Sequence, residues 1–314
     1  MRPYTEVTTL PDLDVLCMAC CCWDLLGIVG RYPELDQKCP MSEMVEAGGG
    51  QSATASAAIA TLGGKAAVMG RVGSDKNGRN ITEALEAVGV ETGPIRVIPD
   101  TTSQFAICII HESTGKRSIM WRNGTMGKPT PDDVDPALVA RAKAVLIDSH
   151  AIDAGIYCAQ VARELDKPVV LDLEKPNERN VELTSLATHP IFPLHFGQEL
   201  TGETEPEAIC RAILGLGPET AIITMGDQGC VAVTSDETHH VPAFKVDVVD
   251  TTGAGDVFHG AFAYGLALGK PLAENLRFAS AAAALSTRGL GGRARLGTMG
   301  EVEALLTKGE TLPQ

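Results

Sequence analysis

The sequence predicts an α/β protein with a doubly wound, mostly parallel sheet and helices on both faces. Short apolar segments typical of buried strands alternate along the chain with longer segments that carry one apolar face, as successive βαβ units require. Further β-type sequence interrupts this alternation at residues of about 25–47 and 101–122. A doubly wound domain does not need this β-type sequence, so we expect the two inserts to lie outside the main sheet of a single domain that spans residues 1–314.

The individual elements follow from the hydrophobic pattern. Short apolar runs predict strands at residues 15–22, 65–72, 144–148, 168–172, 220–224 and 230–234. Helical periodicity predicts helices at residues 52–62, 77–88, 154–165, 206–214, 254–268 and 271–287. The last two helices are rich in alanine and leucine, so we expect them to pack against the sheet. Within the second insert, residues 104–110 and 117–121 have strand-like sequence.

Composition excludes several classes of protein. Of the 314 residues, 44% are hydrophobic and 21% are charged, which is enough apolar surface for a large core and argues against disorder. A net charge of −14 disfavours a nucleic-acid partner, because the chain has no basic stripe that would displace counterions. No apolar run reaches the roughly 20 residues that cross a bilayer. We therefore expect a soluble, cytoplasmic protein with no membrane partner.

A cysteine cluster lies in the first predicted strand. The chain has nine cysteines, and Cys17, Cys20, Cys21 and Cys22 are close together. A Cys-x-x-Cys pair can hold a metal or act in redox chemistry, but no second pair follows at ligand spacing. On a strand, Cys20 and Cys22 would face one side and Cys21 the other. We interpret these residues as buried thiols in a reducing compartment.

The sequence Gly253-Ala254-Gly255-Asp256 is the strongest functional signal. It follows an apolar strand-like segment and begins a long apolar helix, whose exposed backbone N–H groups can bind an anion where side chains are small. Asp256 falls in the first helical turn, beside any bound anion. Phosphoryl transfer needs an anion cradle and a group that accepts the proton of the attacking hydroxyl. The same residues also fit an ordinary capped turn between a strand and a helix.

Two motifs together carry a family resemblance. Residues 250–263 resemble the C-terminal signature of the ribokinase (PfkB) family of sugar and nucleoside kinases. Residues 47–55, with the glycines that follow at 63–64 and 70–78, resemble the N-terminal glycine signature of that family. The resemblance implies a ribokinase-like fold in which the inserts at about 25–47 and 101–122 form a small β-sheet lid over the sugar. It also implies an ATP-dependent phosphotransferase that acts on an alcohol group. It makes Asp256 the catalytic base, with the amides of Gly253, Ala254 and Gly255 holding the developing negative charge.

The resemblance also indicates where the sugar binds. Open α/β sheets bind ligands beyond the carboxyl ends of their strands, where we expect Asp24 and the turn Gly48-Gly49-Gly50-Gln51. In the family, an aspartate at the position of Asp24 binds sugar hydroxyls, and the glycines let the sugar approach the backbone. Asp24 also fits a strand-end cap, and the glycines a tight turn before a helix.

The nucleotide site is implied by similar matches. Thr224, Gly226 and Gly229 resemble the family's phosphate loop, and the adenine pocket would include Ala283 and Ser286. The resemblance implies ATP and Mg²⁺ as cofactors. Potassium-activated members place cation ligands at the positions of Asp250 and Thr252, so K⁺ is a further candidate. The acid of the family's N-x-x-E motif is missing from residues 193–196, and Glu199 has the wrong spacing. Magnesium would therefore be held by waters and nucleotide phosphates.

The sugar is the least determined part of the prediction. Residues 242–261 and 276–280 look like those of sulfofructose kinases, a branch that phosphorylates 6-deoxy-6-sulfofructose at its C1 hydroxyl. Lys38, Arg122 and Asn123 are candidates to bind the sulfonate, although a lone lysine is more often a solvated charge. Where that branch has an arginine, this chain has His150, which donates one hydrogen bond without a full charge and also fits a strand-end histidine.

Three alternatives to a sulfofructose kinase stay open. A fructokinase or ribokinase-type enzyme would act on an unsulfonated sugar. A nucleoside kinase is disfavoured, because only 4% of the residues are aromatic and could stack on a base. A catalytically silent sugar-binding regulator is disfavoured by the intact Asp256. For any of the kinases, the resemblance implies a homodimer that forms through the β lid.

Overall fold

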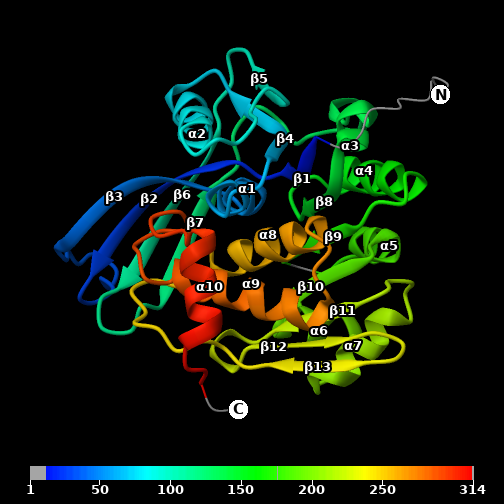
Figure 1. Ribbon diagram of the computed structural model, residues 1–314. Helices are drawn as coiled ribbons and strands as arrows, with labels where there is room; N and C mark the ends of the chain where they lie inside the picture. Colours follow the sequence, from blue (N-terminus) through cyan, green and yellow to red (C-terminus); the bar gives the residue numbers. More distant parts are fainter. Residues whose placement is uncertain (1–11, 175, 313–314) are drawn as a thin grey trace.

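The computed structural model describes residues 12–174 and 176–312. A nine-stranded sheet runs through the molecule, and a four-stranded sheet projects from one side of it (Figure 1). The large sheet has the order β13-β12-β11-β10-β9-β8-β1-β4-β5, and it is parallel from β5 to β11 and antiparallel at β12 and β13. Its strands are β1 (Leu13–Ala19), β4 (Ala66–Gly73), β5 (Ile95–Ile98), β8 (Ala142–Asp148), β9 (Val169–Asp172), β10 (His189–Pro193), β11 (Ala221–Thr224), β12 (Cys230–Val233) and β13 (Thr238–Val241). The predicted doubly wound, mostly parallel sheet is confirmed.

Helices bury both faces of the large sheet. Alternate residues of a strand point to opposite faces, so Val15 and Cys17 of β1 join one core cluster, while Leu16 and Met18 join the other. The first cluster lies under α1 (Gln51–Thr61), α2 (Lys76–Glu86), α8 (Ala254–Ala267), α9 (Leu272–Ser286) and α10 (Met299–Lys308). The second lies under α3 (Pro136–Arg141), α4 (Ile152–Glu164), α5 (Glu178–Leu186), α6 (Leu194–Thr201) and α7 (Pro206–Leu214). Among the described residues, none of these helices has the length and apolar character that crossing a bilayer requires.

The small sheet is built from both predicted inserts. Its strands are β2 (Cys22–Val29), β3 (Met41–Gly49), β6 (Gln104–His111) and β7 (Arg117–Arg122), in the order β3-β2-β6-β7. The central pair, β2 and β6, is parallel, and the two outer pairs are antiparallel. We call this sheet the lid.

The prediction of one strand over residues 15–22 is wrong. Strand β1 ends at Ala19, which has φ 130°, and the chain enters the lid at Cys22. The apolar run therefore belongs to two different sheets, and no glycine or proline marks the break. Asp24 consequently lies inside β2 and not at the end of β1.

The cysteine side chains nevertheless alternate as expected. Cys20 and Cys22 pack with Ala106, whereas Cys21 joins the main core. All three are buried thiols without disulfides, and burial raises the pKa of Cys21 to about 12. The described residues contain no group of three or more His, Cys, Asp or Glu side chains placed to hold a metal ion.

Candidate active site

The first turn of α8 lies between two cavities. One cavity, of about 300 Å³, lies under the lid and is lined by Gly253 and Asp256; we call it the lid cavity. The other, of about 340 Å³, lies beside α9 and is lined by Ala254 and Gly255; we call it the α9 cavity. Gly253 caps the helix with φ 74°, and a Cβ added at Gly255 would meet nothing within 4 Å. Ligands in both cavities can therefore reach the same helix N-terminus.

Asp256 has the environment of a proton acceptor. Burial raises the pKa of its carboxyl group well above the usual range, and the neighbouring Asp172 carboxylate raises it further. A carboxylate with a raised pKa accepts a proton more readily than a solvated one. Because Asp256 lines the lid cavity, a hydroxyl bound there can reach it.

Asp172 and His259 form a buried pair behind Asp256. Asp172 ends β9, and its Oδ2 lies 3.6 Å from Nδ1 of His259. The two ring nitrogens of His259 also lie 2.7 Å from the Gly255 carbonyl oxygen and 2.8 Å from the Ile191 carbonyl oxygen. Burial lowers the pKa of His259, and the two carbonyl groups oppose that effect. The sequence analysis missed this pair, although Asp172 follows the strand-end rule that drew attention to Asp24.

On the lid side, Asp24 lines the cavity while being only 9% exposed. Burial raises the pKa of its carboxyl group, against the lowering effect of the Cys22 thiol and of Arg293. A Cβ at Gly49 would collide with the Asp24 side chain, and one at Gly48 would collide with Arg293. These two glycines make room for an acidic and a basic side chain.

Gly50 is the glycine of this run that lines the lid cavity, together with Gln51. It has φ 89°, and a Cβ there would lie 2.6 Å from the Cys20 carbonyl oxygen. Arg293, which the sequence analysis did not single out, is fixed beside the run: its Nη2 donates to the Gly49 carbonyl oxygen at 2.6 Å. Only Gly50 therefore offers the close backbone approach that was expected of all three glycines.

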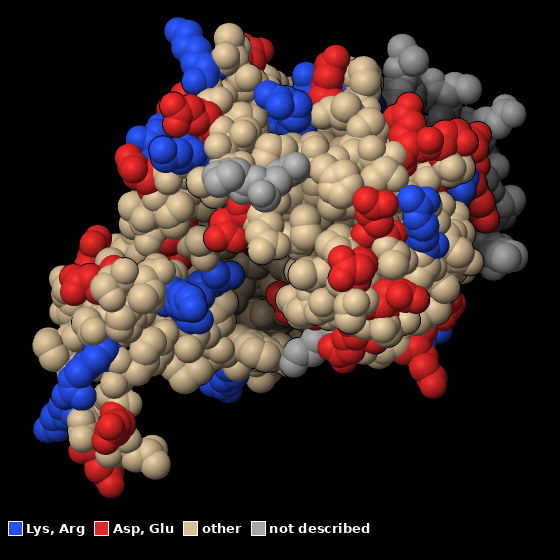
Figure 2. All heavy atoms as spheres, turned by 90° about the horizontal axis from the view of Figure 1, so that it is seen from below, with Lys and Arg blue, Asp and Glu red and all other residues tan. Residues whose placement is uncertain are grey.

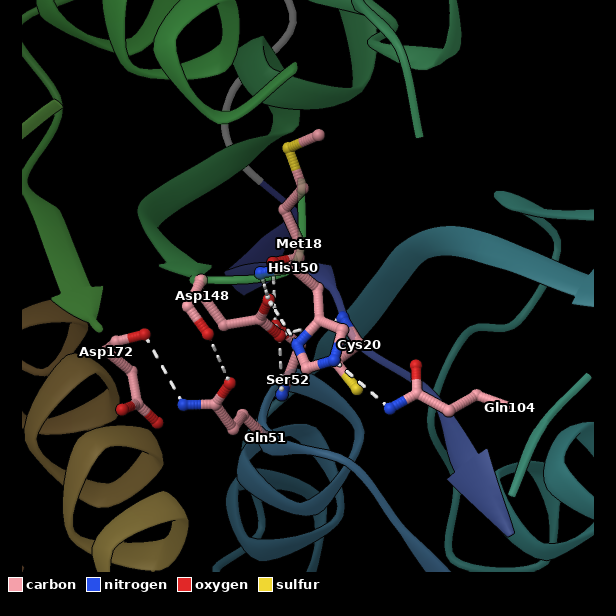
Figure 3. Close-up of polar contacts among 9 residues, drawn as sticks. Met18, Cys20, Gln51, Ser52, Gln104, Asp148, His150 and Asp172 are labelled. Carbon is pink, nitrogen blue, oxygen red and sulfur yellow. Dashed lines mark hydrogen bonds and ion pairs between the residues drawn. The ribbon is translucent and has the colours of Figure 1, made fainter. Parts of the chain in front are cut away.

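A buried carboxylate fixes the turn that leads into α1. Asp148, at the end of β8, is fully buried, and its Oδ2 accepts hydrogen bonds from the Cys20 N–H at 2.7 Å and from the Ser52 hydroxyl at 2.6 Å (Figure 3). Its Oδ1 accepts from the His150 N–H at 2.9 Å. Gln51 accepts from the Ser149 hydroxyl at 3.0 Å. The lid-cavity ends of β1, β8 and α1 are thereby tied together.

The α9 cavity contains most of the residues expected to bind the nucleotide. Thr224, Gly226, Gly229, Gly255 and Ala283 line it, whereas Gly253 lines the lid cavity. Ser286 does not line it, because its position on α9 differs from that of the lining residues, which recur at helical spacing. Its hydroxyl donates to the Ala283 carbonyl oxygen at 2.8 Å. The lining residues of this face of α9 and its C-cap are Ser280, Ala283, Ala284 and Thr287.

Asp250 and Thr252 form a buried turn before α8. One oxygen of Asp250 accepts from the Thr252 hydroxyl at 2.7 Å and from its N–H at 2.9 Å. The other oxygen accepts from the Gly291 N–H at 2.9 Å. Asp250 thus ties the catalytic turn to the segment that follows α9.

The basic residues expected to hold a sulfonate lie in different places. Lys38 is exposed in the connection between β2 and β3, and it lines neither cavity. Arg122 also lines neither, because side chains alternate along β7: Arg117, Ile119 and Trp121 line the lid cavity. His150 lines the lid cavity, and Asn123 lines a smaller cavity beside it. Figure 2 shows a hollow in the surface with Lys and Arg side chains beside it.

The segment where the family acid is missing offers no carboxylate to either cavity. Phe196, at its last position, is fully buried in the core, and Glu199 is exposed on α6. The carboxylates that do line the lid cavity are those of Asp24, Glu174 and Asp256.

Comparison with known proteins agrees with this geometry. Residues 13–298 match the model of the pfkB family carbohydrate kinases. The chain is 30% identical over 298 residues to a ribokinase of Bacillus subtilis, covering 91% of this chain and 97% of that protein. It is 29% identical to fructokinase-1 of Zea mays, covering 84% of this chain and 90% of that protein.

Solved structures show the same fold. A putative ribokinase from Agrobacterium tumefaciens superposes with a TM-score of 0.87 at 29% identity, covering 94% of this chain and 97% of that one. A ribokinase of Arabidopsis thaliana, solved with ribose and ATP, superposes with a TM-score of 0.83 at 27% identity, covering 96% of this chain and 100% of that one. The chain therefore belongs to the pfkB family of carbohydrate kinases and is a phosphotransferase with a ribokinase-like fold.

Proposed function

We propose that the protein transfers the γ-phosphoryl group of ATP to a primary hydroxyl group of a sugar held in the lid cavity. The observation that carries the proposal is the first turn of α8, which adjoins both cavities. Asp256 lies on the sugar side and Gly255 on the nucleotide side, so acceptor and donor meet at one helix N-terminus. The Arabidopsis ribokinase structure contains ribose and ATP, which supports the same pairing of ligands here.

The residues divide the reaction between them. Asp256 accepts the proton of the sugar hydroxyl as its oxygen forms a bond to the γ-phosphorus, and the bond to ADP breaks. The backbone N–H groups at Gly253, Ala254 and Gly255 face the negative charge that the phosphoryl group carries. Asp24 is the candidate hydrogen-bond acceptor for the other sugar hydroxyls. The lid restricts access of water, which would otherwise take the phosphoryl group.

The cations of the proposal are Mg²⁺ and K⁺. Magnesium would neutralise charge on the nucleotide phosphates, and with no cluster of ligating side chains among the described residues we assign it to the phosphates and to waters. The potassium proposal rests on the family resemblance of Asp250 and Thr252. Both oxygens of Asp250 already accept backbone hydrogen bonds, so a cation would use their remaining lone pairs.

For the sugar, 6-deoxy-6-sulfofructose stays the leading proposal, and an unsulfonated fructose or ribose is its rival. Support comes from the sequence resemblance around residues 242–261. Neither Lys38 nor Arg122 lines the lid cavity. Any recognition of a sulfonate must therefore use other basic residues.

The first test combines a substrate panel with one substitution. ADP release is measured with sulfofructose, fructose, ribose and adenosine, in buffers with and without K⁺. Asp256→Asn keeps the size of the side chain but cannot act as the base, so kcat should fall by about 10²-fold or more. ATP affinity, measured by calorimetry, should change little. Near-normal kcat in the variant would show that Asp256 is not the base. No turnover of any sugar by the wild type would favour a sugar-binding regulator.

A further inference from the structure

A third cavity adjoins the lid cavity, and the proposed phosphoryl transfer does not use it. It has a volume of about 110 Å³ and shares Cys20, Gln104 and His150 with the lid cavity. We call it the annex. No residue of the α8 turn lines the annex, which adjoins the part of the lid cavity that these three shared residues line.

The charged side chains that line the annex are basic, whereas most of those that line the lid cavity are acidic. Arg71 and Lys128 line the annex, and no Asp or Glu of the described part of the chain does. Among the residues that the structure describes, the lid cavity is lined by three carboxylate residues and one arginine, Arg117. In a chain of net charge −14, the annex is therefore a local basic site. An anionic group is favoured in the annex and disfavoured beside the carboxylates of the lid cavity.

Arg71 is held in place with hydrogen-bonding capacity left over. Its Nη2 lies 2.7 Å from Asp133 Oδ2, and Asp133 is shared with Arg96, whose Nη1 lies 2.5 Å from Oδ1. One carboxylate thus serves two guanidinium groups, which leaves net positive charge. The Nε of Arg71 is buried without a hydrogen-bond partner among the described residues. A Cβ added at Gly127, in the wall of the annex, would lie 3.4 Å from Arg71 Nη1.

His150 and Gln104 lie where the annex meets the lid cavity. Gln104 Nε2 and His150 Nε2 are 3.1 Å apart, and Figure 3 shows the two side chains facing each other. Nδ1 of His150 lies 3.9 Å from Oδ1 of Asp148. That Nδ1 is buried and has no hydrogen-bond partner among the described residues. Asn123 adds an amide group to the lining.

We propose that the annex binds an anionic group carried by the sugar at a carbon remote from the hydroxyl that is phosphorylated. The substrate class would then be acidic sugars, with a carboxylate, a sulfonate or a phosphate at that carbon. The volume of about 110 Å³ is several times the roughly 30 Å³ that one water takes up in the liquid, so a small polyatomic anion fits. This inference rests on the proposed sugar kinase activity, and it assigns recognition to Arg71 and Lys128.

The test uses one sugar skeleton with four groups at C6. Fructose, fructuronate, 6-deoxy-6-sulfofructose and fructose 6-phosphate all keep the C1 hydroxyl and differ only in the C6 substituent. Each is assayed for kcat/KM and titrated by calorimetry with the wild type, Lys128→Met and Lys128→Arg. Lys308→Met on α10 is the matched control, because it removes the same charge from an exposed position outside the three cavities.

The inference expects at least one anionic derivative to exceed fructose in kcat/KM. Lys128→Met should raise KM for that derivative by about 10- to 100-fold, as expected for loss of a charge-assisted hydrogen bond, and should leave fructose within about twofold. Lys128→Arg should retain most of the preference, and Lys308→Met all of it. Preference for fructose over all three anions, or equal losses on both classes in Lys128→Met, would overturn the inference while leaving a sugar kinase. If no sugar is turned over, the proposed function fails, and the titrations alone still decide whether the annex selects anions.

Discussion

At the scale of single residues, burial raises the pKa of Asp256 most, and two neighbours then shift it in opposite directions. The Asp172 carboxylate raises it, and His259 lowers it. Glu174 and Asp148 raise it as well, with smaller effects than Asp172. The base must be ionised to accept a proton, so activity should fall as the pH drops through the pKa of Asp256. The acidic limb of the pH profile therefore reports on this cluster.

We predict opposite shifts of that limb for two substitutions. Asp172→Asn removes the negative neighbour, so the pKa of Asp256 falls and the limb moves to lower pH. His259→Gln removes the group that favours the ionised carboxylate, so the pKa rises and the limb moves to higher pH. Profiles of kcat/KM against pH, recorded with saturating ATP, measure both shifts. Shifts in the same direction, or no shift in either variant, would contradict an electrostatic role for the pair.

At the scale of elements, two glycines of the α8 turn have different roles. Gly253 adopts a strained backbone conformation, and Gly255 adjoins the proposed nucleotide site. Gly253 has φ 74°, and a Cβ there would lie 2.7 Å from Gly292 Cα. Gly255 has no such conformation, and the space above it is open. We predict that Gly253→Ala loses about 1–2 kcal/mol of stability from the left-handed conformation alone, and more from the clash. Gly255→Ala should keep the wild-type stability and raise KM for ATP.

Thermal unfolding and ATP titration distinguish the two glycine variants. The prediction fails if Gly255→Ala is as unstable as Gly253→Ala, or if it binds ATP normally. In the latter case the nucleotide phosphates would not lie against this part of the helix.

The elements that sequence reasoning found are those with long or strongly apolar patterns. Helix α7 was predicted with its observed bounds of 206–214, and α8 was predicted to within one residue. Strands β5, β10 and β13 were missed because they are short and partly polar: β13 reads Thr-His-His-Val and β5 contains Arg96. Helices α3, α5, α6 and α10 were also missed; none of them exceeds ten residues, so each offers only a few turns of helical periodicity.

The residues of the candidate site also fall into those that the sequence predicts and those that it does not. Motifs that act through the backbone, such as the α8 turn and the Thr224 loop, can be recognised because they need glycine at fixed spacing. Side chains that meet through the fold cannot be paired from sequence. Arg122 was named as a candidate for its place at the end of a predicted strand, and Arg117 was not considered; the facing of β7, which the sequence does not give, puts Arg117 in the lid cavity. Arg71 and Lys128 come together only through the tertiary structure.

At the scale of the whole molecule, the lid has an apolar outer face. Side chains of β6 and β7 that point away from the lid cavity include Ile107 and Met120, which face each other across the two strands and are 37% and 53% exposed. Met44 on β3 is 57% exposed. Strand β7 is also an edge strand, and no other described strand pairs with its outer side. An exposed apolar face beside an unpaired edge favours association with a second surface.

We predict that this face joins two copies of the chain into a homodimer. Met120→Glu places a charge in the proposed interface, so the variant should be monomeric by light scattering, whereas Val181→Glu on α5, which replaces a residue that is 37% exposed, should stay dimeric. The monomer should also have a raised KM for the sugar, because Trp121, 60% exposed at the lid cavity, would lose any cover that the partner gives it. A wild-type protein that is monomeric at assay concentration would refute the dimer. A Met120→Glu variant that stays dimeric would show that the dimer interface is not this face of the lid.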